Sequence, residues 1–225
     1  MDTTQLAYTY RLVSEMFIYP EERDMARIKT EMDWLDEAPA EIRTPLKAFL
    51  ALPAAMSAEE YVATLELTPV VPLYLGAHLY GEPKTCRGAG TSGRNSYMLE
   101  LANIYRHFGI ELEGGEMADF VPVVIEFLAI SLDRGDADEI GLRRYFVEQL
   151  LVKGFEALLA ALRRYESPYA HLVDALQVAL AEDVKHMAGG PKWRPPAGDD
   201  QPPISAVVHD QAAADNATST NGVEL

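Results

Sequence analysis

The chain has 225 residues, 48% of them hydrophobic, and Asp and Glu outnumber Lys and Arg by 35 to 19, for a formal net charge of -16. This acidity excludes nucleic acid as an expected partner, because nucleic-acid binding depends on Lys and Arg that neutralise phosphates, and it disfavours an anionic membrane surface. A chain this apolar can bury a sizeable core, which excludes global disorder. The negative charge favours a basic partner, although acidity also simply keeps a protein in solution.

A single cysteine, Cys86, excludes an intrachain disulfide and any site built on several cysteines, such as a zinc or iron–sulfur centre. The first ten residues lack a basic stretch followed by an apolar one, so no export signal is expected. The longest uncharged run, residues 67–81, is too short to span a bilayer. We therefore expect a cytoplasmic protein without stable membrane association.

The apolar pattern is helical from the start of the chain. Apolar residues recur every three or four positions in the first segment, which predicts a helix that Pro20 ends. Further helices are expected at residues 21–37 and 40–50. Ser57 and Glu60 form the signature of a capping box, so another helix should begin at this point.

Residues 67–90 interrupt the helical pattern, because they contain several helix-breaking prolines and glycines, and an irregular connection is expected there. The next helix is predicted at about residues 91–108, with Gly109 as its C-terminal stop. Three more helices are predicted at about residues 119–133, 137–165 and 168–187. No segment shows the sustained alternation of a strand. The sequence therefore predicts an all-α fold, a single-domain bundle of about seven or eight helices.

The composition changes after Gly189. Residues 190–225 contain five prolines, many small polar residues and little apolar mass, which predicts a disordered C-terminal tail behind an all-helical domain at residues 1–189. The tail holds five acidic and two basic residues, which leaves 30 acidic and 17 basic residues in the domain, a net charge of -13. The acidity is therefore a property of the folded part.

The residues from Gly88 to Gly93 fit the G-x-G-x-x-G fingerprint of dinucleotide-binding proteins. The fingerprint works only where a strand feeds the turn inside a βαβ unit, and residues 82–87 do not read as a strand. A loop that leads into a helix is the preferred interpretation. The free N–H groups at the start of that helix still offer a place for a phosphate, and the candidate anion-binding residues are Arg87, Thr91, Ser92 and Arg94.

A second candidate lies at residues 116–128, where Asp119 suits an N-cap and Pro122 suits the first turn of a helix. Seven residues are nearly two turns, so Asp119 and Glu126 are predicted to lie on one face, roughly 10 Å apart. That spacing is long for two carboxylates that share one catalytic step, but it suits a groove for an extended basic peptide. The alternative is a helix cap and a solvated glutamate, although an ionised Glu126 among apolar neighbours needs a partner.

The third candidate is the segment His78-Leu-Tyr80-Gly81-Glu82, whose polar groups would line a binding site unless His78 merely ends a helix that Gly81 caps. Catalytic motifs are otherwise missing, because no HExxH, GxSxG or Walker A sequence occurs and the five histidines lack metal-ligand spacing. Cys86 has basic neighbours but no assignable partner histidine. We therefore expect neither an enzyme nor a metal site.

Four stretches of the chain carry a family resemblance. They are residues 11–20, which end in Tyr-Pro, residues 61–82, which end in His-Leu-Tyr-Gly-Glu, residues 98–128, which contain Glu116-x-x-Asp119-x-x-Pro122-x-x-x-Glu126-Phe-Leu, and residues 167–173. Together they resemble the nitrate reductase delta-subunit group of molybdoenzyme chaperones, the NarJ branch of the TorD/DmsD superfamily. The third stretch is the most specific, and the similarity covers about residues 5–185.

The resemblance implies a helical chaperone that binds the basic N-terminal or twin-arginine peptide of an apo catalytic subunit. The client would be a molybdoenzyme of the DMSO reductase family, such as a respiratory nitrate reductase or a relative. Such a chaperone holds no cofactor permanently, and it assists insertion of molybdopterin guanine dinucleotide into the client before membrane attachment or export. By motif position, the implied peptide-binding residues are His78, Gly81, Glu82, Asp119, Pro122 and Glu126, to which Tyr80 and Glu116 of the same segments are added.

Two other functions remain open from the sequence. One is a nucleotide- or pterin-binding maturation factor that uses the loop Gly88–Arg94. The other is a structural subunit that is retained in the finished enzyme complex. The sequence makes no prediction of the oligomeric state.

Overall fold

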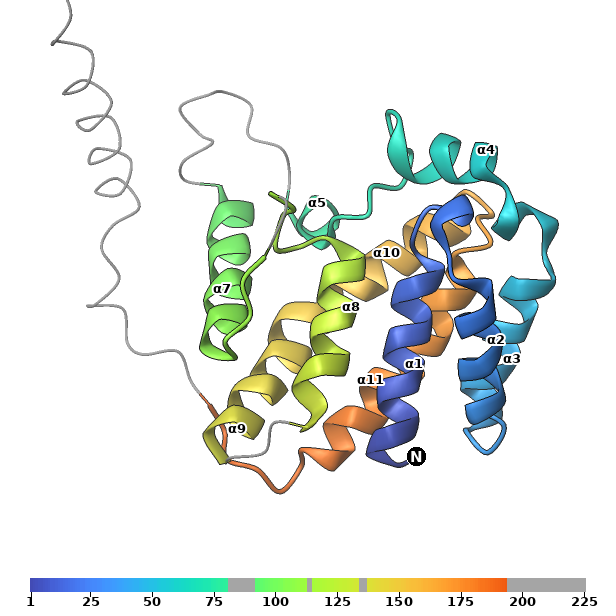
Figure 1. The fold of residues 1–225 in the computed structure, drawn as a ribbon. Helices are drawn as coiled ribbons and strands as arrows, with labels where there is room; N and C mark the ends of the chain where they lie inside the picture. The colour runs from blue at the N-terminus through green and yellow to red at the C-terminus, as the bar shows by residue number, and fades with distance from the viewer. Residues whose placement is uncertain (81–91, 113–114, 134–136, 194–225) are drawn as a thin grey trace, which may run out of the picture.

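The computed structural model of the chain describes residues 1–80, 92–112, 115–133 and 137–193, and most of these residues are helical (Figure 1). The α-helices are α1 (Thr3–Met16), α2 (Met25–Trp34), α3 (Ala40–Ala51), α4 (Ala58–Tyr61), α5 (Leu75–Leu79), α7 (Gly93–His107), α8 (Val121–Ile130), α9 (Ala137–Tyr145), α10 (Val152–Arg164) and α11 (Ala170–His186). Short 3-10 turns are η1 (Pro20–Glu22), η2 (Pro53–Met56) and η4 (Ser131–Asp133), and π-helical segments are η3 (Val62–Glu66) and η5 (Phe146–Leu151).

The predicted all-α class is confirmed. Within the described ranges there is no strand, and a single isolated antiparallel bridge joins Tyr74 to Phe120. Eight of the described α-helices have nine or more residues, which agrees with the expected seven or eight. None of the helices in the described part is both long and apolar enough to cross a membrane.

The helices pack around one hydrophobic interior. α1 packs against α8 and α11, and α11 also contacts α3 and α10 (Figure 1). Two clusters of aromatic side chains fill this interior. One contains Phe17, Phe49, Tyr61 and Tyr169, and the other contains Tyr105, Phe108, Phe127 and Phe146, with ring centroids 4.7–6.0 Å apart in contacting pairs of both clusters.

Several helix ends follow the local signals in the sequence. Gly109 ends α7 with a φ of 70°, and Gly109 N and Ile110 N donate to Arg106 O and Tyr105 O, each at 2.9 Å, which is the Schellman arrangement. Ser57 Oγ accepts from Glu60 N at 3.2 Å at the start of α4. The Glu60 carboxylate, however, accepts from Thr64 Oγ1, so only half of the predicted capping box forms.

The predicted helix at residues 137–165 is confirmed as one nearly continuous run of α9, η5 and α10. Its middle is π-helical, which the sequence did not indicate. A π-helical turn disturbs the regular hydrogen-bond ladder and leaves carbonyl groups available to side chains. Tyr97 of α7 donates its hydroxyl hydrogen to one of these, Leu150 O, at 3.0 Å, and so fastens α7 to this long helix.

A buried ion pair connects α9 to α11. Arg143 of α9 donates to both carboxylate oxygens of Asp183 in α11, at 2.5 and 2.6 Å. Tyr10 of α1 donates to Asp183 Oδ2 at 2.7 Å, and Arg143 also donates to Ser131 Oγ and Leu128 O. The pKa of Tyr10 is raised, first by burial and then by Asp183. This group of side chains, the Arg143–Asp183 joint, therefore ties together α1, the end of α8, α9 and α11.

The predicted tail lies almost wholly outside the described residues, because the structure describes only residues 190–193 of it. Gly190 N donates to Met187 O at 3.0 Å, and the ring of Trp193 lies 4.6 Å from that of Tyr145. These residues therefore pack on α9 beyond the expected domain boundary at residue 189.

Candidate functional site

Asp119 lies just before α8, and the prediction that it caps this helix is wrong. Phe120 occupies the N-cap position instead, without a side-chain cap. The cause is backbone pairing with the segment that leads into α5. Leu75 N donates to Asp119 O and Val121 N donates to Leu73 O, each at 2.9 Å. This bridge holds Asp119 outside the helix and turns its carboxylate toward other partners.

The Asp119 side chain is fully buried and joins three elements. Its Oδ2 atom accepts from Gly76 N of α5 at 3.0 Å and from Arg94 Nε of α7 at 3.2 Å. The Arg94 guanidinium also lies over the ring of Tyr74, 5.7 Å from its centroid. Asp119 Oδ1 is buried without a hydrogen-bond partner among the described residues. Asp119 is thus an interior anchor, not a surface acid.

The predicted common face of Asp119 and Glu126 is therefore wrong as well. Glu126 is exposed on α8, whereas Asp119 is buried before the helix begins. Pro122 lies in the first turn of α8 as predicted, and its carbonyl accepts from Ser14 Oγ of α1 at 3.0 Å. Pro122 is buried, so it holds α8 on α1 and does not contribute a binding surface.

Glu116 and Glu126 do lie together, in an open cavity of about 360 Å³ between the end of α7 and α8. We call it the α7–α8 groove, and it is lined by Tyr105, Ile110, Glu111, Leu112, Glu116, Val123, Glu126, Phe127 and Ile130. Three carboxylates stand around an apolar and aromatic floor. Apolar side chains of a ligand would lose water here, while cationic side chains would meet the carboxylates.

Glu116 connects this groove to the buried cluster around Asp119. Its Oε1 atom accepts from Met117 N at 3.0 Å and from the Tyr74 hydroxyl at 3.3 Å. The pKa of Tyr74 is raised by burial and by the neighbouring Glu116 carboxylate, so this hydroxyl stays protonated and remains a donor. Tyr74 therefore touches both Glu116 and the Arg94 that pairs with Asp119.

His78 and Tyr80 serve the fold and lie outside the lining of the α7–α8 groove. His78 Nε2 is 2.8 Å from Pro72 O, and because a carbonyl only accepts, Nε2 is the donor. Burial lowers the pKa of His78, which favours the neutral ring. The Tyr80 ring packs against Tyr97, with centroids 5.7 Å apart. Gly81 and Glu82 are outside the described residues.

Only two of the four predicted anion-binding residues, Ser92 and Arg94, lie within the described ranges. Ser92 caps α7, with its Oγ accepting from Arg94 N at 3.3 Å, and the Arg94 side chain is engaged by Asp119. Arg87 and Thr91 lie outside the described ranges. Within those ranges, no three His, Cys, Asp or Glu side chains are grouped so as to hold a metal ion.

Sequence reasoning missed Glu111, Tyr74 and Gly76. Glu111 stands two residues beyond the Gly109 stop, so a turn that folds this segment back onto α7 was a usable signal. Tyr74 and Gly76 carried no comparable signal, because their roles depend on pairing with a segment more than 40 residues further along the chain.

Comparisons with known proteins agree on one family. A family model described as nitrate reductase delta subunit matches residues 33–175, more than half of the chain. The chain is 27% identical over 185 residues to the "Probable nitrate reductase molybdenum cofactor assembly chaperone NarJ" of Bacillus subtilis (strain 168), which covers 80% of this chain and 92% of that protein.

A second similarity is to the "Nitrate reductase-like protein NarX" of Mycobacterium tuberculosis, in strains CDC 1551 / Oshkosh and ATCC 25618 / H37Rv. The identity is 30% over 173 residues, which is 74% of this chain. The chain spans only 23% of the length of these NarX proteins. The similarity therefore concerns one part of a much longer protein.

Proposed function

The chain belongs to the nitrate reductase delta subunit family, and from this membership we propose that it is an assembly chaperone, not an enzyme, for a nitrate reductase or a related molybdoenzyme. It binds the basic N-terminal or twin-arginine peptide of the apo catalytic subunit in the cytoplasm. There it holds the subunit while molybdopterin guanine dinucleotide is inserted, before membrane attachment or export. The chaperone keeps no cofactor of its own.

The observation that carries the peptide-binding part of this proposal is the α7–α8 groove. An apolar floor surrounded by Glu111, Glu116 and Glu126 matches a peptide that alternates apolar and basic residues. The folded domain around it has a net charge of -13, which attracts such a peptide from a distance. Exposed ion pairs contribute only about 0.2–1 kcal/mol each. Affinity should therefore come mainly from apolar contacts, and orientation from the carboxylates.

The similarity to the Bacillus subtilis protein supports the same function. That protein is named as a molybdenum cofactor assembly chaperone, and the chain covers 92% of its length. The positions first implied by the family resemblance need revision within this proposal. Glu116 and Glu126 remain peptide contacts and Glu111 joins them, whereas His78, Tyr80, Asp119 and Pro122 position the elements behind the groove.

Charge reversal in the groove tests the site. In Glu116→Lys/Glu126→Lys, the affinity for a synthetic N-terminal peptide of the catalytic subunit should fall about tenfold or more, because two attractions become repulsions. Isothermal titration calorimetry measures the affinity, and circular dichroism should show unchanged helicity. The matched control is Glu37→Lys/Glu156→Lys, which makes the same change in net charge at two exposed carboxylates outside the groove. Equal affinity in both variants would contradict the assignment.

The two other functions give different results in related assays. A nucleotide- or pterin-handling factor would release heat with GTP or the molybdopterin nucleotide but not with the peptide. A retained subunit would copurify with the active enzyme at equal stoichiometry. The engagement of Arg94 by Asp119 leaves this arginine less available to a phosphate, which favours the peptide.

A further inference from the structure

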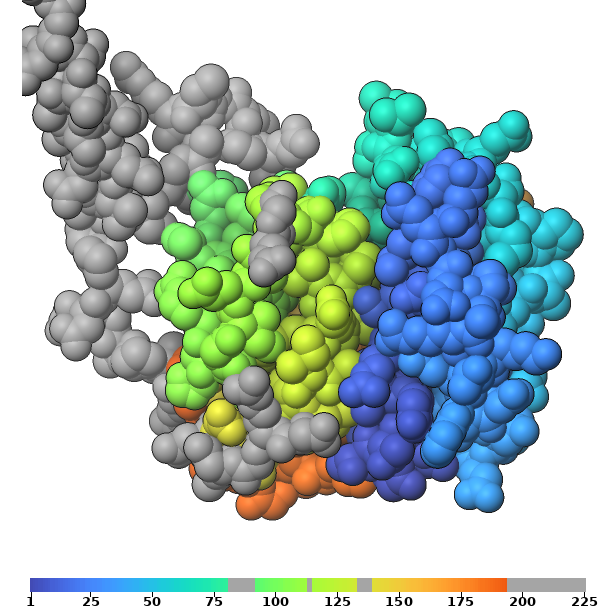
Figure 2. Space-filling model, in the orientation of Figure 1, coloured from blue at the N-terminus to red at the C-terminus, as the bar shows by residue number. Residues whose placement is uncertain are grey.

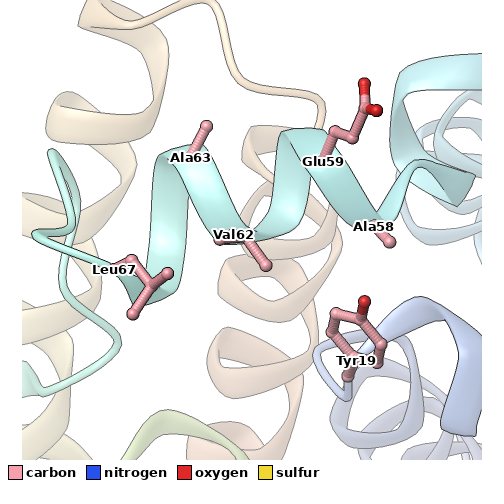
Figure 3. A pocket seen from close by; sticks show the side chains of 6 residues that line it. All are labelled: Tyr19, Ala58, Glu59, Val62, Ala63 and Leu67. Carbon is pink, nitrogen blue, oxygen red and sulfur yellow. The ribbon is translucent and has the colours of Figure 1, made fainter.

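α4 projects from the rest of the bundle (Figure 1, Figure 2), and a second open groove lies beside it. We call it the Tyr19 groove; its volume is about 440 Å³, and it is lined by Tyr19, Ala58, Glu59, Val62, Ala63 and Leu67. Figure 3 shows Ala58 and Val62 on the side of the helix toward Tyr19, with Glu59 at the outer edge. None of the lining residues of the α7–α8 groove recurs here, so the two grooves are separate surfaces.

The most exposed large hydrophobic side chain of the described residues borders this groove. Leu67 is 73% exposed, and Val70 nearby is 46% exposed. The backbone holds Leu67 in this position, because Leu67 N donates to Val62 O at 3.2 Å and Val71 N donates to Thr64 O at 3.0 Å. The Tyr19 groove and the exposed Leu67 side chain form a continuous apolar surface, and such surfaces commonly bind a partner.

Core side chains hold the lining residue Tyr19 in place. Tyr61 packs edge-on against Tyr19 with ring centroids 5.5 Å apart, and its hydroxyl donates to Phe17 O at 3.1 Å. Beneath them, the buried Arg23 directs its donors inward, to Ile18 O, Ala55 O and Tyr169 Oη. The groove is therefore preformed, and the nearest buried cation is turned away from it.

Carboxylates surround the apolar surface. Glu59 lines the groove, Glu21 and Glu22 follow Tyr19 after Pro20, and Glu66 directly precedes Leu67. All four are exposed. The pKa of Tyr19 is raised by burial and then by the negative charges of Glu21, Glu66 and Glu22. An apolar surface with this border fits an apolar segment flanked by Lys and Arg.

The negative charge around the Tyr19 groove disfavours other possible occupants. A second copy of the chain would bring a domain of net charge -13, and residues 190–225 hold five acidic and two basic residues, so both would be repelled. Anionic lipid would be repelled as well. The helix formed by α4 and η3, residues 58–66, offers a wall about 13 Å long, enough for about two turns of a partner helix.

We propose that the Tyr19 groove is a second docking site, which takes a basic amphipathic helix of the catalytic subunit from a segment other than the N-terminal peptide. This inference rests on the proposed chaperone function. Apolar residues at i, i+3 or i+4, and i+7 of the client helix would lie along Val62 and Leu67, with Lys and Arg on its flanks meeting the four glutamates. Two separate contacts would raise the avidity for the whole subunit above that for either segment.

Photocrosslinking of the full chain with the purified apo catalytic subunit tests this site. Benzoylphenylalanine is placed at Leu67 in the Tyr19 groove, at Ile130 in the α7–α8 groove, or at Leu99, an exposed leucine of α7, as the control. We expect position 67 to join a Lys- or Arg-containing client segment with helical apolar spacing, different from the segment joined at position 130. Position 99 should give no adduct.

The crosslinking result distinguishes a failure of the docking site from a failure of the proposed function. If position 130 joins the client and position 67 does not, or if both join the same segment, the docking site is overturned and the proposed function stands. An adduct of position 67 with a second copy of the chain also overturns it. If neither groove position joins the client, the proposed function fails and the docking site fails with it.

A second test compares the affinity for the whole apo subunit with the affinity for the isolated N-terminal peptide. Leu67→Glu should weaken binding to the whole apo subunit at least about fivefold and leave the affinity for the isolated N-terminal peptide unchanged. Leu67 is so exposed that this change should not unfold the chain. Leu99→Glu is the matched control and should change neither affinity. Unchanged binding of Leu67→Glu to the whole subunit would overturn the docking site.

Discussion

The role of Asp119 depends on what surrounds it, not on its place in the sequence pattern. It is buried, and the only hydrogen bonds to its carboxylate from the described residues come from Gly76 N and Arg94 Nε. A buried carboxylate with few donors depends strongly on each of them, because an ionised group without partners is costly in an apolar interior. Asp119 therefore fixes α5 and α7 to the start of α8. The acidic residues of the α7–α8 groove are not part of this buried cluster.

Removing this carboxylate should destabilise the fold. Asp119→Ala leaves Gly76 N without an acceptor and Arg94 without its ion pair, and we expect the free energy of unfolding to fall by about 2–3 kcal/mol. Urea denaturation followed by circular dichroism measures this. Glu126→Ala changes an exposed carboxylate, and its effect should stay within about 0.5 kcal/mol. Equal losses in the two variants would show that Asp119 is not an anchor.

His78 should make stability depend on pH. Burial lowers its pKa below the ordinary value of 6.5, so the folded chain binds a proton less readily than the unfolded chain. The free energy of unfolding should therefore be unaffected by this group above about pH 6.5 and should fall as the pH drops below it. His78→Gln, which keeps a donor for Pro72 O, should flatten this part of the profile. The same slope in both proteins would contradict the assignment.

At the scale of elements, most helices could be predicted because their signals are local. The Gly109 stop and the long helix at residues 137–165 follow from turn chemistry and apolar periodicity. The cap at Asp119 could not be predicted correctly, because the N-cap signature at Asp119 competes with the bridge between Tyr74 and Phe120, and only the fold decides between them. The two grooves likewise depend on which helices meet, and no single segment contains that information.

The close approach of Gly76 in α5 to Asp119 and to Arg94 of α7 predicts a strict requirement for glycine. A Cβ atom added at Gly76 would lie 2.6 Å from Asp119 Oδ2 and 2.9 Å from Arg94 Cγ, so Gly76→Ala must push the ion pair apart. We expect a loss of about 2–3 kcal/mol in the free energy of unfolding. Gly189→Ala is the matched control, since an added Cβ there meets nothing within 4 Å. A Gly76→Ala protein as stable as this control would contradict the close approach.

At the scale of the whole molecule, the Arg143–Asp183 joint holds distant parts of the chain together. Arg143→Met would leave the Asp183 carboxylate buried, with the Tyr10 hydroxyl as its remaining donor in the described part. The free energy of unfolding should fall by about 3–5 kcal/mol. In Arg143→Met/Asp183→Leu both charges are gone, and the loss should be smaller than the sum of the two single losses. Thermal and urea denaturation of the three variants would complete the cycle, and strict additivity would contradict a coupled pair.

The packing of α1 on α11 also sets the order in which the protein can fold while it is being made. About 150 residues separate Met16 at the end of α1 from Ala170 at the start of α11. At roughly 5–20 residues per second, the ribosome needs about 8–30 s to produce them. During that interval Tyr10 has no Asp183 to bind, and the side of α1 that packs on α11 stays uncovered. α1 is therefore synthesised well before the helix that completes its packing, and a nascent chain that stalls before α11 leaves this apolar side of α1 exposed.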